Sequence, residues 1–384
     1  MKDLTALLHL PPAQQEVYFE GPALQPPPGV RPNFTDPPNQ NAMGLGVLIL
    51  CTSIVVLLVT IQLYTRIFYR RKFAIVDGVT VAALGVYGAF IYCFCSVLLH
   101  PGLFVHQWDI RLKDLPHLLY ILNTGSSEYG IIIMLLKVGI LLQWVEIFVR
   151  AGGRDYFWWT CHITIWVNVI FYVICTFLEI FGCSPRQRMW TPWVEGTCID
   201  TAKLIISASF VNLLSDIVIL LLPQVVVWKL HMSAEKKCRT GALFAVGIFA
   251  IVCAGLRTNA SFTFKNGTDI IYAMSTLGFW SLGEMTAGFL VLCLPALPKF
   301  FKSSSWVQTV VTALRSSFGA SSAGSSDKHT SDRNHGWPRS KPKRDPDASL
   351  FTDTHLSHRS FVPLKDVSSS VLERQESEPR TQDV

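Results

Sequence analysis

Charged side chains are scarce in this chain. Of its 384 residues only 16% are Asp, Glu, Lys or Arg, whereas 50% are hydrophobic. A soluble domain carries about a quarter charged residues. A soluble helical protein of this composition would have to bury several all-apolar helices in one core, so a membrane protein is favoured.

The sequence also lacks the motifs of common enzymes and metalloproteins. No CxxC pair with partner histidines is present, so no metal site is predicted. No phosphate-binding loop and no nucleophile–base motif stands out, although catalysis by carboxylates alone would leave no motif. We therefore identify no catalytic residue, and we expect no nucleic-acid partner.

The amino-terminal segment has no signal-peptide pattern, because Asp3, His9 and two prolines interrupt its first 17 residues. The first apolar stretch would therefore act as a signal anchor. Residues 1–42 contain no cysteine and are rich in Pro, Asn and Gln from residue 18 onward, which predicts a short, largely extended extracellular arm.

Seven apolar stretches dominate the rest of the chain. Each is about 20 residues long, enough to cross a hydrocarbon core as a helix. The predicted spans are residues 43–65, 75–99, 127–149, 157–181, 204–228, 240–258 and 273–297. We predict an all-α membrane protein in which residues 43–300 form a seven-transmembrane-helix bundle, in the plasma membrane or another secretory-pathway membrane.

The loops between the spans predict the orientation. The short loops Arg66–Lys72 and Lys229–Arg239 are basic, and Arg150 and Arg154 follow the third span. Lys and Arg concentrate in cytoplasmic loops, which puts the amino terminus outside and the carboxy terminus in the cytoplasm.

Three glycosylation sequons fall on the predicted outer side, at Asn33, Asn259 and Asn266. Asn259 lies close to the membrane and Asn266 is marginal. Asn33 is therefore the best candidate for a glycan.

Residues 301–384 would form a cytoplasmic tail. From about residue 320 there is little to bury, which predicts disorder and a segment suited to phosphorylation and to contact with signalling proteins. Residues 303–318 instead carry apolar side chains at helical spacing beside Lys302 and Arg315, as in a helix that lies on the inner leaflet. A disordered tail with scattered apolar residues is the alternative.

Cys183 and Cys198 stand apart from the other cysteines, most of which lie within spans as small hydrophobes. They flank a predicted outer loop in an oxidising compartment, where thiols pair. Two prolines and Gly196 let this loop fold back, which favours a Cys183–Cys198 disulfide. Pairing elsewhere, or a free thiol, is the alternative.

Three ionisable residues lie halfway through spans three, five and seven: Lys137, Asp216 and Glu284. Ionisable groups inside a bilayer are costly and face the bundle interior. Two carboxylates and one ammonium leave an excess negative charge, so one carboxyl should hold or share a proton. The cluster would be a structural ion pair, a ligand, ion or proton site, or a catalytic acid–base pair. Three further residues near span ends are assigned no function: Glu146, Glu179 and Arg257.

The outer loops carry a second group of polar and aromatic residues: His106, Trp108, Asp109, Trp190 and Trp193. Tryptophan is common at the membrane interface for its amphipathic ring alone. The alternative hypothesis is a lid over a cavity that opens to the outside.

Several segments resemble the fungal rhodopsin-domain family, in the order that the family shows. They are His106–Asp109, Lys137, Cys183…Trp190…Cys198, the run Val211–Met232 that looks like the fifth-span signature, Trp280–Glu284 and Leu294-Pro295. The resemblance covers residues 43 to 300, although Phe104 stands where a second glycine is common. It implies a fungus-specific seven-span protein, a group that includes receptor-like pathogenicity proteins and membrane proteins of secondary-metabolite clusters such as the satratoxin cluster.

The resemblance does not imply retinal. Retinal needs a lysine in the last span for its Schiff base, and residues 273–297 contain none. No cofactor is therefore predicted. Span three ends Glu146–Arg150 without an acidic-Arg-aromatic triplet, and span seven has no Asn-Pro-x-x-Tyr, so G-protein coupling rests on fold analogy alone.

Three classes of function remain. We favour an accessory or receptor-like component linked to a secondary-metabolite pathway, with an unidentified small molecule or metabolite as its ligand. The first alternative is a G-protein-coupled-receptor-like sensor of an extracellular small molecule. The second is a membrane-embedded cyclase-type enzyme that uses Asp216 or Glu284 as a general acid.

Overall fold

The computed structural model describes residues 10–70, 74–149, 153, 155–228, 234–298 and 300. All of them belong to one compact unit, Met1–Ser322. The helix expected at residues 303–318 and the rest of the tail lie outside the described residues, as do several residues of the basic loops.

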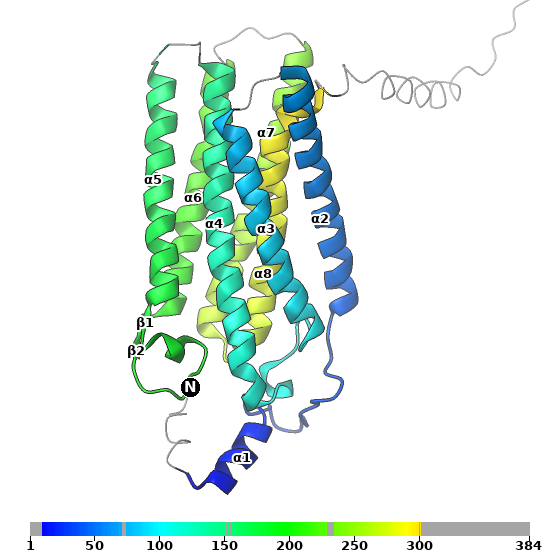
Figure 1. Cartoon of the computed structure of the whole chain (residues 1–384), viewed down its shortest axis with the longest axis vertical. Coiled ribbons are helices and arrows are strands. Elements are labelled where there is room, and N and C mark those ends of the chain that lie inside the picture. Colours follow the sequence, from blue (N-terminus) through cyan, green and yellow to red (C-terminus); the bar gives the residue numbers. More distant parts are fainter. Residues whose placement is uncertain are drawn as a thin grey trace, which may run out of the picture. The chain divides into compact units, whose positions relative to one another are not determined.

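Seven long helices dominate the described part of the chain (Figure 1). They are α2 (Asn41–Tyr64), α3 (Ile75–Leu99), α4 (Leu115–Phe148), α5 (Tyr156–Phe181), α6 (Thr201–Trp228), α7 (Ala234–Asn266) and α8 (Ile270–Cys293). Each is long and apolar enough to cross a membrane. The predicted seven-helix membrane fold is confirmed.

Two helices extend well beyond their predicted spans. The third span was expected at 127–149, but α4 already begins at Leu115, with a proline in its first turn where proline favours a helix start. The sixth was expected at 240–258, but α7 runs on to Asn266. These extensions change which residues lie deep in the bundle.

The bundle turns apolar side chains outward. On α5, Ile163, Trp166 and Val167 are 59%, 64% and 60% exposed. By contrast, Lys137 and Glu284 are buried inside the bundle. In water so large an apolar surface would favour aggregation, whereas in lipid it is the stable arrangement. The protein is therefore a multi-pass protein of a lipid bilayer.

α8 lies at the heart of the bundle and packs against α2, α4 and α7. Gly288 permits the close approach of α4, because a Cβ atom at this position would lie 2.9 Å from Leu136 Cδ1. Small residues allow such close helix contacts in membranes. This contact brings the middle of α4, where Lys137 follows Leu136, next to α8.

One end of the bundle, which we call the disulfide end, carries the short elements. They are α1 (Pro12–Glu20), η3 (Gln107–Asp109), η4 (Leu112–Asp114), β1 (Cys183–Ser184), η5 (Arg186–Met189) and β2 (Thr197–Cys198). Cys183 and Cys198 are partners across the two-stranded sheet and form the predicted disulfide. With a sequence separation of 15 residues, this cross-link stabilises the fold by about 3 kcal/mol in the chain-entropy model.

The amino-terminal arm is more structured than a largely extended segment. It contains α1, and the residues after this helix are bonded to the loop before α4. Ala23 N donates to Ile110 O at 2.8 Å, and Leu112 N donates to Gly21 O at 3.0 Å. The arm is thereby fixed to the disulfide end.

At the opposite end α2 continues into the π-helical turn η2 (Thr65–Arg70), and α8 continues into η6 (Leu294–Ala296). We call this the Arg66 end. Arg66 was expected in the short basic loop after the first span. The helical conformation instead continues through Arg66, which is 6% exposed and directs its side chain toward Asp77 of α3 and Glu146 of α4.

Candidate functional site

The first ion pair of the bundle interior joins α4 and α6. Lys137 Nζ lies 2.9 Å from Asp216 Oδ1. It also donates to the backbone carbonyl of Asn212 at 3.0 Å, to Asn212 Oδ1 at 2.7 Å and to the hydroxyl of Ser215. A buried ammonium is stable only with such a full set of acceptors, so this lysine is completely satisfied.

The second ion pair joins α7 and α8. Arg257 Nε donates to Glu284 Oε2 at 3.0 Å, and both side chains are almost fully buried. Tyr129 on α4 donates its hydroxyl to the same oxygen at 3.0 Å, and its ring lies 4.7 Å from the guanidinium carbon. Arg257 Nη1 also donates to Ser209 Oγ at 3.3 Å.

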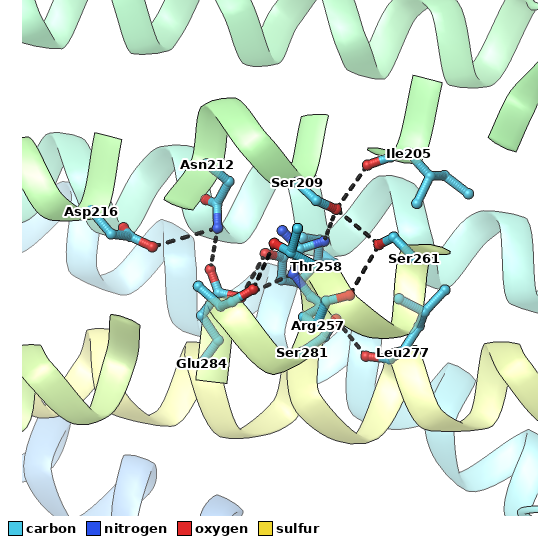
Figure 2. A network of polar contacts seen from close by, with 12 residues as sticks. Ile205, Ser209, Asn212, Asp216, Arg257, Thr258, Ser261, Leu277, Ser281 and Glu284 are labelled. Atoms are coloured by element: carbon cyan, nitrogen blue, oxygen red, sulfur yellow. Dashed lines mark hydrogen bonds and ion pairs between the residues drawn. The ribbon is translucent and has the colours of Figure 1, made fainter. Parts of the chain in front are cut away.

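Asn212 on α6 connects the two pairs (Figure 2). Its Nδ2 donates to Glu284 Oε1 at 2.6 Å, whereas its Oδ1 accepts from Lys137 and from the hydroxyl of Tyr172. We call the whole group the central network: Tyr129, Lys137, Tyr172, Ser209, Asn212, Ser215, Asp216, Arg257 and Glu284. It links α4, α5, α6, α7 and α8 through one set of polar contacts.

The structure thus brings the three predicted residues into one network and adds a fourth charge. Arg257 was expected near the outer end of its span and was given no role. The expected depth was wrong, because α7 continues to Asn266 and Arg257 therefore lies inside the bundle. The network holds two cations and two carboxylates. Arg257 therefore balances the negative charge that Lys137, Asp216 and Glu284 alone would leave.

Cavities lie on both sides of the central network. The larger, of about 710 Å³, reaches Lys137, Asp216 and Glu284 and extends to Phe148 and Pro298 at the Arg66 end. The smaller, of about 100 Å³, lies toward the disulfide end and includes the two network residues Tyr129 and Arg257 in its lining. Small-molecule sites measure roughly 300–1,000 Å³, so only the larger cavity has the size of one.

A third ionic group closes the Arg66 end. Arg66 Nη1 and Nη2 donate to the two carboxylate oxygens of Glu146 at 2.8 and 2.9 Å, and Arg66 Nε lies 3.2 Å from Asp77 Oδ1. Bidentate pairs of this kind are strong and directional. The contacts of Arg66 with Asp77 and Glu146 hold the end of α2 against α3 and α4. The sequence analysis assigned no function to Glu146 and so missed this role.

At the disulfide end, His106 is held by α8. Its ring stacks on Trp108 and on Tyr272, with ring centroids 4.2 and 4.8 Å away. Its Nδ1 lies 2.6 Å from Oδ2 of Asp269, the N-cap residue of α8. His106 therefore fixes the loop before α4 to the start of α8, and Trp108 packs on the His106 ring.

The other proposed lid residues make different contacts. Asp109 accepts a hydrogen bond from the backbone of Asn33 at 2.9 Å. Trp190 packs against Tyr120 on α4, and Trp193 packs against a ring of α1. The aromatic contacts of Trp190 and Trp193 are thus with α4 and α1, apart from the His106 group. A shared role as a lid stays a prediction.

No group of three or more His, Cys, Asp and Glu side chains that could hold a metal ion occurs among the described residues. The polar groups of the central network provide hydrogen bonds and paired charges beside a largely apolar cavity.

Comparison with known proteins adds the family context. Residues 43–303 match the family described as Fungal rhodopsin domain. The chain is 35% identical over 319 residues to Fugralins biosynthesis cluster protein 2 of Gibberella zeae, which covers 82% of this chain and 78% of that protein. It is 34% identical to a SAT4 family membrane protein of Emericella nidulans, over 51% of this chain and 50% of that one. It is 26% identical to Satratoxin biosynthesis SC1 cluster protein 4 of Stachybotrys chartarum, over 34% and 48%.

No solved structure matches the chain. The sequence match, which spans all seven helices, agrees with the seven-helix bundle described above. The chain belongs to the fungal rhodopsin domain family.

Proposed function

We propose that this protein is an accessory membrane component of a fungal secondary-metabolite biosynthesis pathway. The observation that carries the proposal is the similarity, over 82% of this chain, to a protein named for the fugralins biosynthesis cluster. Further relatives are named for the wortmanamides and satratoxin clusters. Similar sequences thus occur in proteins that are named for different biosynthesis clusters, which fits a supporting role better than one particular reaction.

The geometry of the central network supports a non-catalytic role. A cyclase-type enzyme would need Asp216 or Glu284 as a general acid within reach of its substrate. Each of these carboxylates is instead bonded to a buried cation, Lys137 or Arg257. Paired in this way, they stabilise the packing of the helix bundle, and their oxygens already have protein partners.

The cavities also argue against the alternative of a sensor for an extracellular molecule. The cavity toward the disulfide end is about 100 Å³, too small for a metabolite, whereas the cavity at the Arg66 end is about 710 Å³. We propose that the disulfide end faces the outside, where cysteines pair, and the Arg66 end faces the cytoplasm. A ligand would then come from the cytoplasmic side, where a biosynthetic pathway would supply it.

This orientation predicts a glycan on Asn33, an exposed residue of the arm. Treatment with an enzyme that removes asparagine-linked glycans should shift the mobility of the wild-type protein, and Asn33→Gln should reduce that shift. Asn259→Gln is the matched control, because Asn259 lies within α7, where a glycan would enter the membrane. A tag after Val384 should be reached only in permeabilised cells, and its labelling on intact cells would reverse the orientation.

Deletion of the gene followed by metabolite profiling tests the function. For an accessory component, the end products of one pathway should fall several-fold without accumulation of a single precursor, and transcripts of the biosynthetic genes should stay unchanged. Accumulation of one defined precursor would indicate an enzyme instead. A joint fall of the transcripts would indicate a receptor, and an unchanged metabolite profile would remove the pathway role.

A further inference from the structure

We propose that the cavity at the Arg66 end binds one neutral, largely apolar small molecule that carries hydroxyl donors, and that Gln62 and Gln143 accept its hydrogen bonds. The proposal rests on the proposed function for the source of this molecule, but the site itself is inferred from the geometry alone.

The walls of the cavity select an apolar ligand. Its volume of about 710 Å³ lies in the range of small-molecule sites. Side chains of α2, α4, α6, α7 and α8 line it, and the apolar ones include Ile140, Leu220, Phe244 and Val291. Burial of an apolar body against such walls contributes about 25 cal/mol for each Å² removed from water.

The charges that line the cavity already have partners. Lys137 is paired with Asp216, and Glu284 with Arg257. At the mouth Arg66 is paired with Glu146. A charged ligand would have to be desolvated without a free counter-charge, which is costly in so buried a site. A neutral ligand has no such cost.

Two acceptors in the lining lack partners among the described residues. Gln62 Oε1 and Gln143 Oε1 are buried without a hydrogen bond, and the two residues are 1% and 4% exposed. The amide nitrogen of Gln62 donates to Thr80 Oγ1 at 3.4 Å, so the carbonyl oxygen is the part of this amide that has no hydrogen bond. An unsatisfied buried polar group destabilises the free protein, and a ligand hydroxyl within hydrogen-bond distance of it would remove that cost.

The positions of the two glutamines place the polar end of the ligand. Gln62 on α2 lies about one turn before Arg66 of η2, which continues that helix, and Gln143 lies about one turn before Glu146 on α4. Because Arg66 and Glu146 are bonded at 2.8 Å, the two glutamines lie one turn deeper in the bundle. The hydroxyl group of the ligand would lie behind this ion pair, and its apolar body would lie against α6, α7 and α8.

A hydroxylated apolar molecule has two sources, the pathway and the sterols of the membrane itself. Native mass spectrometry of the full-length protein separates them, with protein purified from a wild-type fungal host and from a host that lacks the core synthase of the pathway. A bound neutral mass only in the first supports the site with a pathway ligand. The same mass from both hosts supports the site with a sterol-type ligand. In that case the metabolite profile of the deletion strain still decides the proposed function separately.

Variants then locate the molecule. Combining Gln62→Met with Gln143→Met should lower the occupancy about tenfold, because two hydrogen bonds of about 0.5–1.5 kcal/mol are lost. The melting temperature should change little, since neither carbonyl oxygen has a protein partner to lose and the contact from the Gln62 amide to Thr80 Oγ1 is long, at 3.4 Å. Gln187→Met is the matched control, on the exposed turn η5 away from the cavity.

A second pair of variants tests the volume. Ala250→Trp fills the cavity from α7 and should abolish binding, whereas Val252→Trp, on the exposed face of the same helix, should leave it intact. Absence of a bound molecule from both hosts would overturn the proposal. So would a bound molecule that is charged, or an occupancy that neither the glutamine variants nor Ala250→Trp reduce.

Discussion

Replacing Arg257 by methionine is expected to lower the free energy of unfolding by about 3–5 kcal/mol, because breaking a buried pair leaves an uncompensated charge. The charge in question is the Glu284 carboxylate, whose side chain is only 4% exposed. Its remaining hydrogen bonds from Tyr129 and Asn212 come from neutral groups and do not replace the cation. The loss should appear as a lower folded yield and a lower melting temperature in detergent.

The partner is identified by rescue. Addition of Glu284→Leu to Arg257→Met should recover most of the loss, because replacing both members of a buried pair by apolar residues is often nearly neutral. Asp216→Leu is the control of matched chemistry and should not rescue. A harmless Arg257→Met, or a rescue by Asp216→Leu, would show that the ion pairs are arranged differently.

Lys137→Met is expected to cost a similar amount, toward the lower end of the same range. Its partner Asp216 keeps some access to the cavity, with a side chain that is 16% exposed, so the stranded carboxylate is partly hydrated. Here Asp216→Leu should restore the folded yield and Glu284→Leu should not. Melting temperatures of the two single and two double variants complete the measurement.

Together the two rescue experiments form a crossed test. Each lysine or arginine variant has one predicted partner, and the partner of one serves as the control for the other. If Glu284→Leu rescued both cation variants equally, Glu284 would neutralise Lys137 as well as Arg257. That result would contradict the two separate ion pairs at 2.9 and 3.0 Å.

The seven helices could be predicted from the sequence because a helix that crosses the bilayer needs about 20 consecutive apolar residues, and such stretches stand out in the hydropathy of the chain. The sequence did not predict the ends of α4 and α7, because a membrane helix continues after its apolar stretch for as long as backbone hydrogen bonds and neighbours support it. The α7 end had the larger consequence. With its span expected to finish at residue 258, Arg257 was placed at the interface and not in the core.

The candidate site was predictable only where charge stood out. Lys137, Asp216 and Glu284 are conspicuous because ionisable residues are rare within apolar spans. Asn212 and Tyr129 gave no such signal, since neutral polar residues occur in many membrane helices with ordinary local partners. Their roles depend on which helix faces which, information that a single sequence does not contain.

The same reason explains the outer residues. His106, Trp108 and Trp193 share one predicted side of the membrane, yet the aromatic contact of Trp193 is with Phe19 of α1, whereas His106 stacks on Trp108 and Tyr272. The cysteine pair was easier to predict, because two cysteines in one short loop have few other partners. Two residues in one short loop must lie close together, and the sequence alone shows this. Two residues that only share a side of the membrane can lie far apart.

The position of Asn212 restricts how this interior can diverge. A primary amide has an acceptor at one end and a donor at the other, and Asn212 presents the first to the ammonium of Lys137 and the second to the carboxylate of Glu284. An aspartate here would face a carboxylate of like charge, and a lysine would face an ammonium. The charged pairs are each expected to be replaceable as a unit by apolar residues, whereas the position between them is expected to accept only a neutral residue with both a donor and an acceptor. During evolution the bridge should therefore be more constrained than the charges it joins.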